Sequence, residues 1–179
     1  MRALRLSRLL RRFRREDGNA TVEFTILVPL LFMIFFATLE AGLMMLRWAS
    51  IDRASDMVIR QLRLGQIANP THELLRREIC DRTFMIANCY ENAVVEITRI
   101  NRATFAMPQP NTPCVTRDGT IIMPVTQITP GQQNDLMLIR VCVTVDALLP
   151  SSTYSLPIEY DAQGGYALSV ASVYVNEPS

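Results

Sequence analysis

The chain contains no lysine, one histidine and one tryptophan among its 179 residues. All 18 basic residues are therefore arginine, which excludes no class of function. The single histidine is His72, and no residue with metal-ligand spacing accompanies it, so it predicts neither a zinc site nor a catalytic base. We expect the side chain of His72 to be exposed to solvent.

The motifs of common catalytic sites are also missing. The sequence has no G-x-S-x-G, no H-E-x-x-H and no phosphate-binding loop. Paired acids such as Glu159 and Asp161 stand in a short polar link, where acids are usually solvated. We therefore predict a protein that is not an enzyme and that uses no cofactor, no metal and no small-molecule substrate.

Positive charge is scarce after the first 18 residues. Residues 1–18 hold seven arginines against Glu16 and Asp17, which leaves 11 arginines against 15 acidic residues in the rest of the chain. A mildly acidic remainder argues against nucleic-acid binding. The arginine run itself is typical of residues that stay in the cytoplasm before a membrane helix.

One long apolar run occupies residues 24–46, and Glu40 is its only charge. About 22 residues at about 1.5 Å each span a hydrocarbon core about 30 Å thick, which predicts a transmembrane helix. The run is longer than the apolar part of a secretory signal peptide, and no small-x-small cleavage site follows it. Arg47 and Trp48 stand where an interfacial anchor pair belongs. Glu40 is expected at the outer headgroups or against another helix.

The patterns predict an α+β fold in three parts: a basic cytoplasmic leader (1–18), a transmembrane helix (19–47) and an extracytoplasmic α+β domain (48–179). The long N-terminal helix continues as an amphipathic helix, because apolar residues recur on one face until Gly65. A second helix is predicted over residues 71–86. A small antiparallel sheet follows, with strands predicted at 93–100, 120–128 (an edge strand, because it contains Pro124), 136–148 and 166–175.

Four cysteines, Cys80, Cys89, Cys114 and Cys142, lack C-x-x-C spacing, which disfavours zinc and thioredoxin-type sites. An even number of cysteines outside the cytoplasm favours disulfides. Four cysteines permit three connectivities. We prefer Cys80–Cys89 with Cys114–Cys142, because the first closes a short helix-to-strand loop and the second spans neighbouring strands. Buried free thiols are the alternative.

Gly18 and Glu23 form a G-x-x-x-x-E pattern between the arginine run and the apolar run. This arrangement resembles the class III signal of type IV pilin-like proteins. With an aromatic residue at Phe24, it is similar to the TadE-like pseudopilins of the Tad (Flp) pilus system. Cys80 and Cys89 in EICDRTFMIANC, and the closing VNEP, also look like that family.

The resemblance implies roles for residues at the start of the helix. A prepilin peptidase would cut between Gly18 and Asn19 and leave the helix on the mature chain. The new amine at Asn19 would pair with Glu23 of a neighbouring subunit and set subunit register; the alternative is a solvated glutamate at the cytoplasmic boundary. Pro29 would kink the helix as in pilins, or be an ordinary membrane proline.

The resemblance implies a membrane-anchored pseudopilin or minor pilin that takes part in Tad pilus assembly, adhesion and biofilm formation. Its expected partners are the prepilin peptidase, other pseudopilins, pilus platform proteins and membrane lipid. The expected location is the bacterial inner membrane or the pilus, with one membrane pass, a cytoplasmic N-terminus and a periplasmic C-terminal domain. The alternative function is a membrane-anchored periplasmic binding module with no filament role.

Overall fold

The computed structural model describes residues 20–67, 69–107, 114–115, 117, 128–148 and 158–177. The predicted leader, the Gly18–Asn19 cleavage position, most of the predicted strand 120–128 and Pro178 of the VNEP motif lie outside these residues. The chain divides into two compact units, residues 1–38 and 39–179, and each is described by itself.

Helix α2 (Ala20–Arg63) is one uninterrupted α-helix of 44 residues, which confirms the predicted long helix. It runs through Pro29 and ends before Gly65, whose positive φ of 65° provides the left-handed residue that commonly follows a helix. The amides of Gly65 and Gln66 then donate to the carbonyls of Leu62 and Gln61. The predicted stop at Gly65 is therefore correct.

In the first unit, the described residues 20–38 belong to α2, and most of their side chains are exposed. Large exposed apolar side chains recur on every side of this segment: Val22, Phe24, Ile26, Leu27, Leu30, Leu31, Phe32, Met33, Ile34 and Phe35. Within α2 an 18-residue window has a mean hydropathy of 2.3 and no buried residue. This segment of α2 is apolar on every side and is not buried. By length and composition, α2 could cross a membrane.

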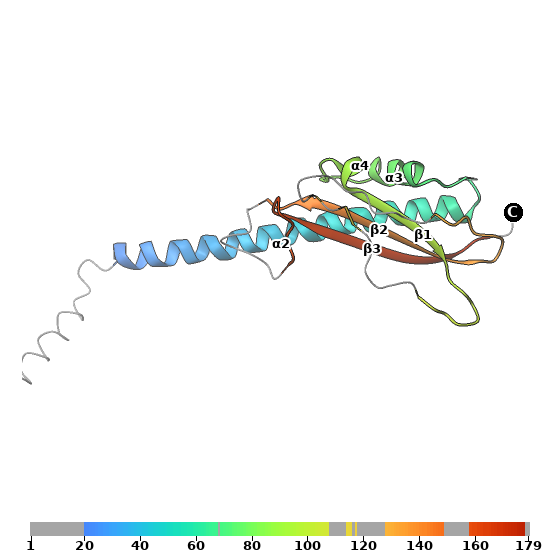
Figure 1. Cartoon of the computed structure of the whole chain (residues 1–179). Helices are drawn as coiled ribbons and strands as arrows, with labels where there is room; N and C mark the ends of the chain where they lie inside the picture. Colours follow the sequence, from blue (N-terminus) through green and yellow to red (C-terminus); the bar gives the residue numbers. More distant parts are fainter. Residues whose placement is uncertain are drawn as a thin grey trace, which may run out of the picture. The chain divides into compact units, whose positions relative to one another are not determined.

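The second unit is built on a three-stranded antiparallel sheet in the order β1-β2-β3 (Figure 1), which confirms the α+β class. The strands are β1 (Ala93–Arg99), β2 (Leu136–Asp146) and β3 (Gly165–Val175). The central strand β2 is buried along nearly its whole length, because both of its faces are covered. Three predicted strands thus form, each within two residues of its expected ends.

The second helix is shorter than predicted. Helix α3 (His72–Cys80) starts after Thr71, whose side chain accepts a hydrogen bond from the amide of Leu74, as expected for a helix cap. It ends at Cys80 instead of residue 86, and a short helix α4 (Cys89–Asn92) follows. A disulfide between Cys80 and Cys89, with Cα atoms 5.7 Å apart, folds the intervening segment back, which a continuing helix could not allow.

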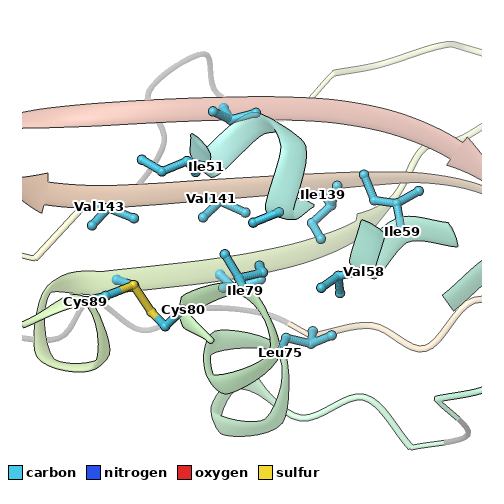
Figure 2. Packing of buried hydrophobic residues seen from close by; sticks show 14 of the residues in the cluster. Ile51, Val58, Ile59, Leu75, Ile79, Cys80, Cys89, Ile139, Val141 and Val143 are labelled. Atoms are coloured by element: carbon cyan, nitrogen blue, oxygen red, sulfur yellow. A yellow bond between two sulfur atoms is a disulfide. The ribbon is translucent and has the colours of Figure 1, made fainter. Parts of the chain in front are cut away.

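One face of the sheet packs against the second half of α2 and against α3 (Figure 2). Ile51, Ala54, Val58 and Leu62 of α2 form the predicted stripe and are buried. Leu75 and Ile79 of α3 and the inward residues of β2, Ile139, Val141 and Val143, complete the cluster. Each fully buried aliphatic side chain contributes about 1.5–3 kcal/mol, so this second half of α2 is part of the core of the domain.

The other face of the sheet carries a second set of buried contacts. A disulfide joins Cys142 of β2 to Cys114, so the structure has the connectivity that the sequence favours. Next to it on β2, the hydroxyl of Thr144 donates to the carbonyl of Val115. Of the predicted strand 120–128, Ile128 is described and forms an isolated parallel bridge with Ile97 on the edge of β1.

Candidate functional site

The sequence places the assembly residues at the start of α2. Glu23 lies in the first turn, where the positive end of the helix dipole favours a carboxylate. Glu23 and Phe24 are both exposed, and Glu23 forms no ion pair with the residues that the structure describes. Both side chains are therefore available to a partner. Gly18 and Asn19 lie outside the described residues, so the cleavage position stays a prediction.

Glu40 is buried, which differs from its expected place at the headgroups or against another helix. Only 5% of the residue is exposed, and its two carboxylate oxygens each lie 3.2 Å from the amide nitrogen of Leu148, which donates to them. The domain's own chain covers this side of α2. A buried carboxylate needs such a donor, because an unpaired charge out of water is costly.

Arg47 joins α2 to three other parts of the domain. Its Nη1 donates to the carbonyl of Asp146 at 2.8 Å and to the hydroxyl of Tyr166 at 3.1 Å. Its Nε donates to the carbonyl of Met85 at 3.2 Å. The neighbouring Trp48 donates its indole N–H to the carbonyl of Ser169 at 3.2 Å. In the structure, the pair that the sequence predicts as an interfacial anchor holds α2 to the domain.

Arg117 forms an ion-pair cluster that sequence patterns do not indicate. It lies 2.7 Å from Asp146 and 2.6 Å from Asp161. Burial opposes ionisation of Asp161, but hydrogen bonds from the Gly165 amide and Arg117 outweigh it and lower the pKa of that carboxyl. A Cβ on Gly165 would lie 1.8 Å from the guanidinium and 2.8 Å from the backbone oxygen of Val145, so a larger residue would displace Arg117. Asp161 is therefore a structural acid and not a freely solvated one.

His72 is half-buried, so the expectation of a solvent-exposed histidine is wrong. Its Nε2 accepts a hydrogen bond of 3.3 Å from the amide of Val95 in the edge strand β1. Burial, followed by the charge of Arg76, lowers the pKa of His72 below its ordinary value. The neutral ring is thus the form that supports the strand edge. Periodicity could not reveal this, because the acceptor and donor lie 23 residues apart.

We expect the free energy of unfolding to be constant above about pH 6.5 and to fall as the pH drops below it, because the unfolded chain then binds a proton that the folded chain resists. The loss levels off below the lowered pKa of the folded state. Denaturant unfolding at about pH 7.5 and about pH 5.5 measures this difference in the free energy of unfolding. His72→Gln keeps an acceptor without this titration and should remove most of the difference. An unchanged difference in that variant would contradict the assignment to this single histidine.

Metal ligands do not converge among the described residues, where no group of three or more His, Cys, Asp or Glu side chains could hold an ion. The disulfides engage all four cysteines. The candidate functional features are the exposed start of α2 and the polar contacts that fix α2 to the domain.

Comparison with known proteins bears on the same helix. The family model described as TadE-like protein matches residues 18–60. No curated protein and no solved structure matches the chain. The family match includes Gly18, Glu23, Phe24 and Pro29 and ends before the first cysteine and the sheet, so the similarity of the cysteine pair and of VNEP to that family stays a prediction. The match confirms the resemblance read from the signal and the helix: over residues 18–60, this chain is similar to the TadE-like proteins.

Proposed function

We propose that this chain is a membrane-anchored pseudopilin or minor pilin that takes part in the assembly of a Tad pilus. The observation that carries the proposal is that the two halves of α2 have different surroundings. One uninterrupted helix contains an exposed apolar segment of membrane-spanning length and a second half buried in the core of an α+β domain. The TadE-like match, over residues 18–60, covers the apolar segment and most of the buried half of that helix.

The proposed topology is a single pass through the bacterial inner membrane, with the arginine-rich residues 1–18 in the cytoplasm and the domain in the periplasm. The two disulfides support this side for the domain, because disulfides persist in the periplasm and are rare in the cytosol. The proposed partners are the prepilin peptidase, other pseudopilins and platform proteins of the pilus, and membrane lipid. Adhesion and biofilm formation would follow from the pilus.

Processing after Gly18 is the direct test of the pilin-like character. Mass spectrometry of the membrane form should find Asn19 as the N-terminal residue, with α2 retained. Gly18→Val should keep Met1 and the leader, because the resemblance implies a peptidase that cuts after glycine. Gly42→Ala is the matched control in the same helix: a Cβ there meets no atom within 4 Å, so processing should be unchanged. Wild-type protein with an intact Met1 terminus would contradict the proposal.

Deletion of the gene separates the proposal from the alternative of an anchored binding module. Loss of surface pili on deletion, restored by the wild-type chain, is the expected result. Full piliation without the chain would favour the binding module, because the anchor would then serve only to hold the domain at the membrane.

A further inference from the structure

The loop between α3 and α4 exposes two large apolar side chains. Phe84 and Met85 are 52% and 53% exposed, although both are side chains that folded domains usually bury. Met85 has a positive φ of 59°, which is uncommon for a residue other than glycine. Residues 84–87 are called the 84–87 loop below. Two large apolar side chains are therefore adjacent and exposed on one loop of the domain.

Polar contacts hold this loop firmly against α2. The amide of Phe84 donates to the hydroxyl of Ser50 at 2.9 Å, and the carbonyl of Met85 accepts from Arg47 at 3.2 Å. A hollow of about 460 Å³ beside these contacts is lined by Leu43 and Arg47 of α2 and by Met85 and Ile86 of the loop. The backbone of the loop is thus fixed alongside residues 43–50 of α2, while the side chains of Phe84 and Met85 stay exposed and Ile86 packs against the core.

The apolar run of the sequence ends within residues 43–50 of α2, where the loop is fixed. Arg47 is the first residue after the run, and Trp48 follows it. On the same stretch of α2, Met45, Leu46 and Trp48 are exposed. Arginine and tryptophan side by side are typical of the boundary between headgroups and acyl chains, where one part of a side chain is wet and the other apolar.

We propose that Phe84 and Met85 insert into the outer headgroup–acyl boundary of the bilayer, so that the folded domain has a lipid contact of its own beside the membrane helix. Lipid is the occupant that fits, because the loop is hydrogen-bonded to Arg47 and Ser50, which directly follow the apolar run. The inference rests on the membrane anchoring in the proposed function, since α2 must first bring the domain to the bilayer.

The opposite end of the sheet supplies a matched control. Phe105 and Met107 are each 64% exposed and lie beyond the end of β1 at Arg99, which pairs with Met137. The 84–87 loop precedes the other end of β1, where Ala93 pairs with Val143. Figure 1 shows the two loops at opposite ends of the strands. The two surfaces carry the same residue types, and only one of them is fixed beside the apolar run.

Two single-tryptophan variants of the full chain test the proposal in vesicles of phosphatidylcholine and phosphatidylglycerol. One variant combines Trp48→Phe with Phe84→Trp, and the control combines Trp48→Phe with Phe105→Trp. Both variants lose the hydrogen bond of Trp48, so this loss does not affect the comparison between them. Vesicles with brominated acyl chains should remove most of the emission of the Phe84→Trp variant, and acrylamide should quench it weakly. The Phe105→Trp variant should show the reverse.

Flotation with the vesicles reports the anchor separately. A chain that floats while Phe84→Trp responds to both quenchers as Phe105→Trp does would overturn the inference and leave the anchor standing. Protection of Phe84→Trp from both brominated lipid and acrylamide would also overturn it, in favour of a protein contact at the loop. A chain that does not float would overturn both the inference and the anchored function.

Discussion

Replacing Glu23 with alanine is expected to abolish pilus assembly while leaving processing after Gly18 intact. Glu23 is exposed in the first turn of α2, with Phe24 beside it, and has no ion pair with the described residues. A charge carried into the bilayer costs about 2.5–3.5 kcal/mol on insertion scales unless it is paired. If the amine at Asn19 of one subunit pairs with this carboxylate of the next, the variant loses that neutralisation, which corresponds to about a hundredfold weaker subunit association.

The measurements are the amount of surface pili and the N-terminal residue of the membrane form. Glu23→Gln removes the charge but keeps the shape, so it should fail like alanine, whereas Glu23→Asp should retain part of the assembly. Thr25→Ala is a matched control two residues away on the same exposed segment, since it removes only a local hydrogen bond to Val22. Normal piliation in Glu23→Ala would leave the alternative, a carboxylate that is merely solvated at the cytoplasmic boundary.

Arg140→Ala is expected to destabilise the domain by about 3–5 kcal/mol, because it leaves the carboxylate of Glu96 buried without its ion-pair partner. Arg140 on β2 and Glu96 on β1 are directly opposite each other, and their side chains are only 8% and 13% exposed. Exchanging both at once, Arg140→Met with Glu96→Leu, should restore the stability or increase it, since well-packed apolar pairs often replace a buried ion pair without loss.

An ion pair whose arginine is exposed, at the end of β1, provides the comparison. Arg99 of β1 lies 3.3 Å from Asp135, but its side chain is 55% exposed, so Arg99→Ala should cost at most about 1 kcal/mol. Denaturant unfolding of the detergent-solubilised chain, followed by the fluorescence of Trp48, measures both variants. Equal losses for Arg140→Ala and Arg99→Ala would show that burial does not decide the strength of these pairs.

Local patterns account for the elements that the sequence predicted well. The apolar stripe through Ile51 and Val58 requires only helical spacing, and the stop at Gly65 requires only a residue that tolerates positive φ. The strands at β1, β2 and β3 follow from β-branched runs bounded by turns. The favoured disulfide pairing followed from the expected adjacency of strands and from a short loop.

Contacts between distant residues were beyond such patterns. Glu40 reaches the amide of Leu148 across 108 positions, and Arg117 reaches Asp161 across 44. The second helix was predicted too long because Ile86 continued its apolar spacing, while the fold turns at Cys80 to close a disulfide. Of the candidate site, the exposure of Glu23 and Phe24 suits an assembly role, and the cleavage position rests on the sequence resemblance.

The sharing of α2 between an apolar segment and the core of the domain has a mechanical consequence. A pull along the helix axis does not reach the domain through a loose tether; it loads Ile51, Val58 and Leu62 together, in shear against the sheet. Many side-chain contacts must then slip at once, whereas a peripheral strand peels away contact by contact. The domain should therefore resist tension applied at its N-terminal side up to forces that unfold its hydrophobic core.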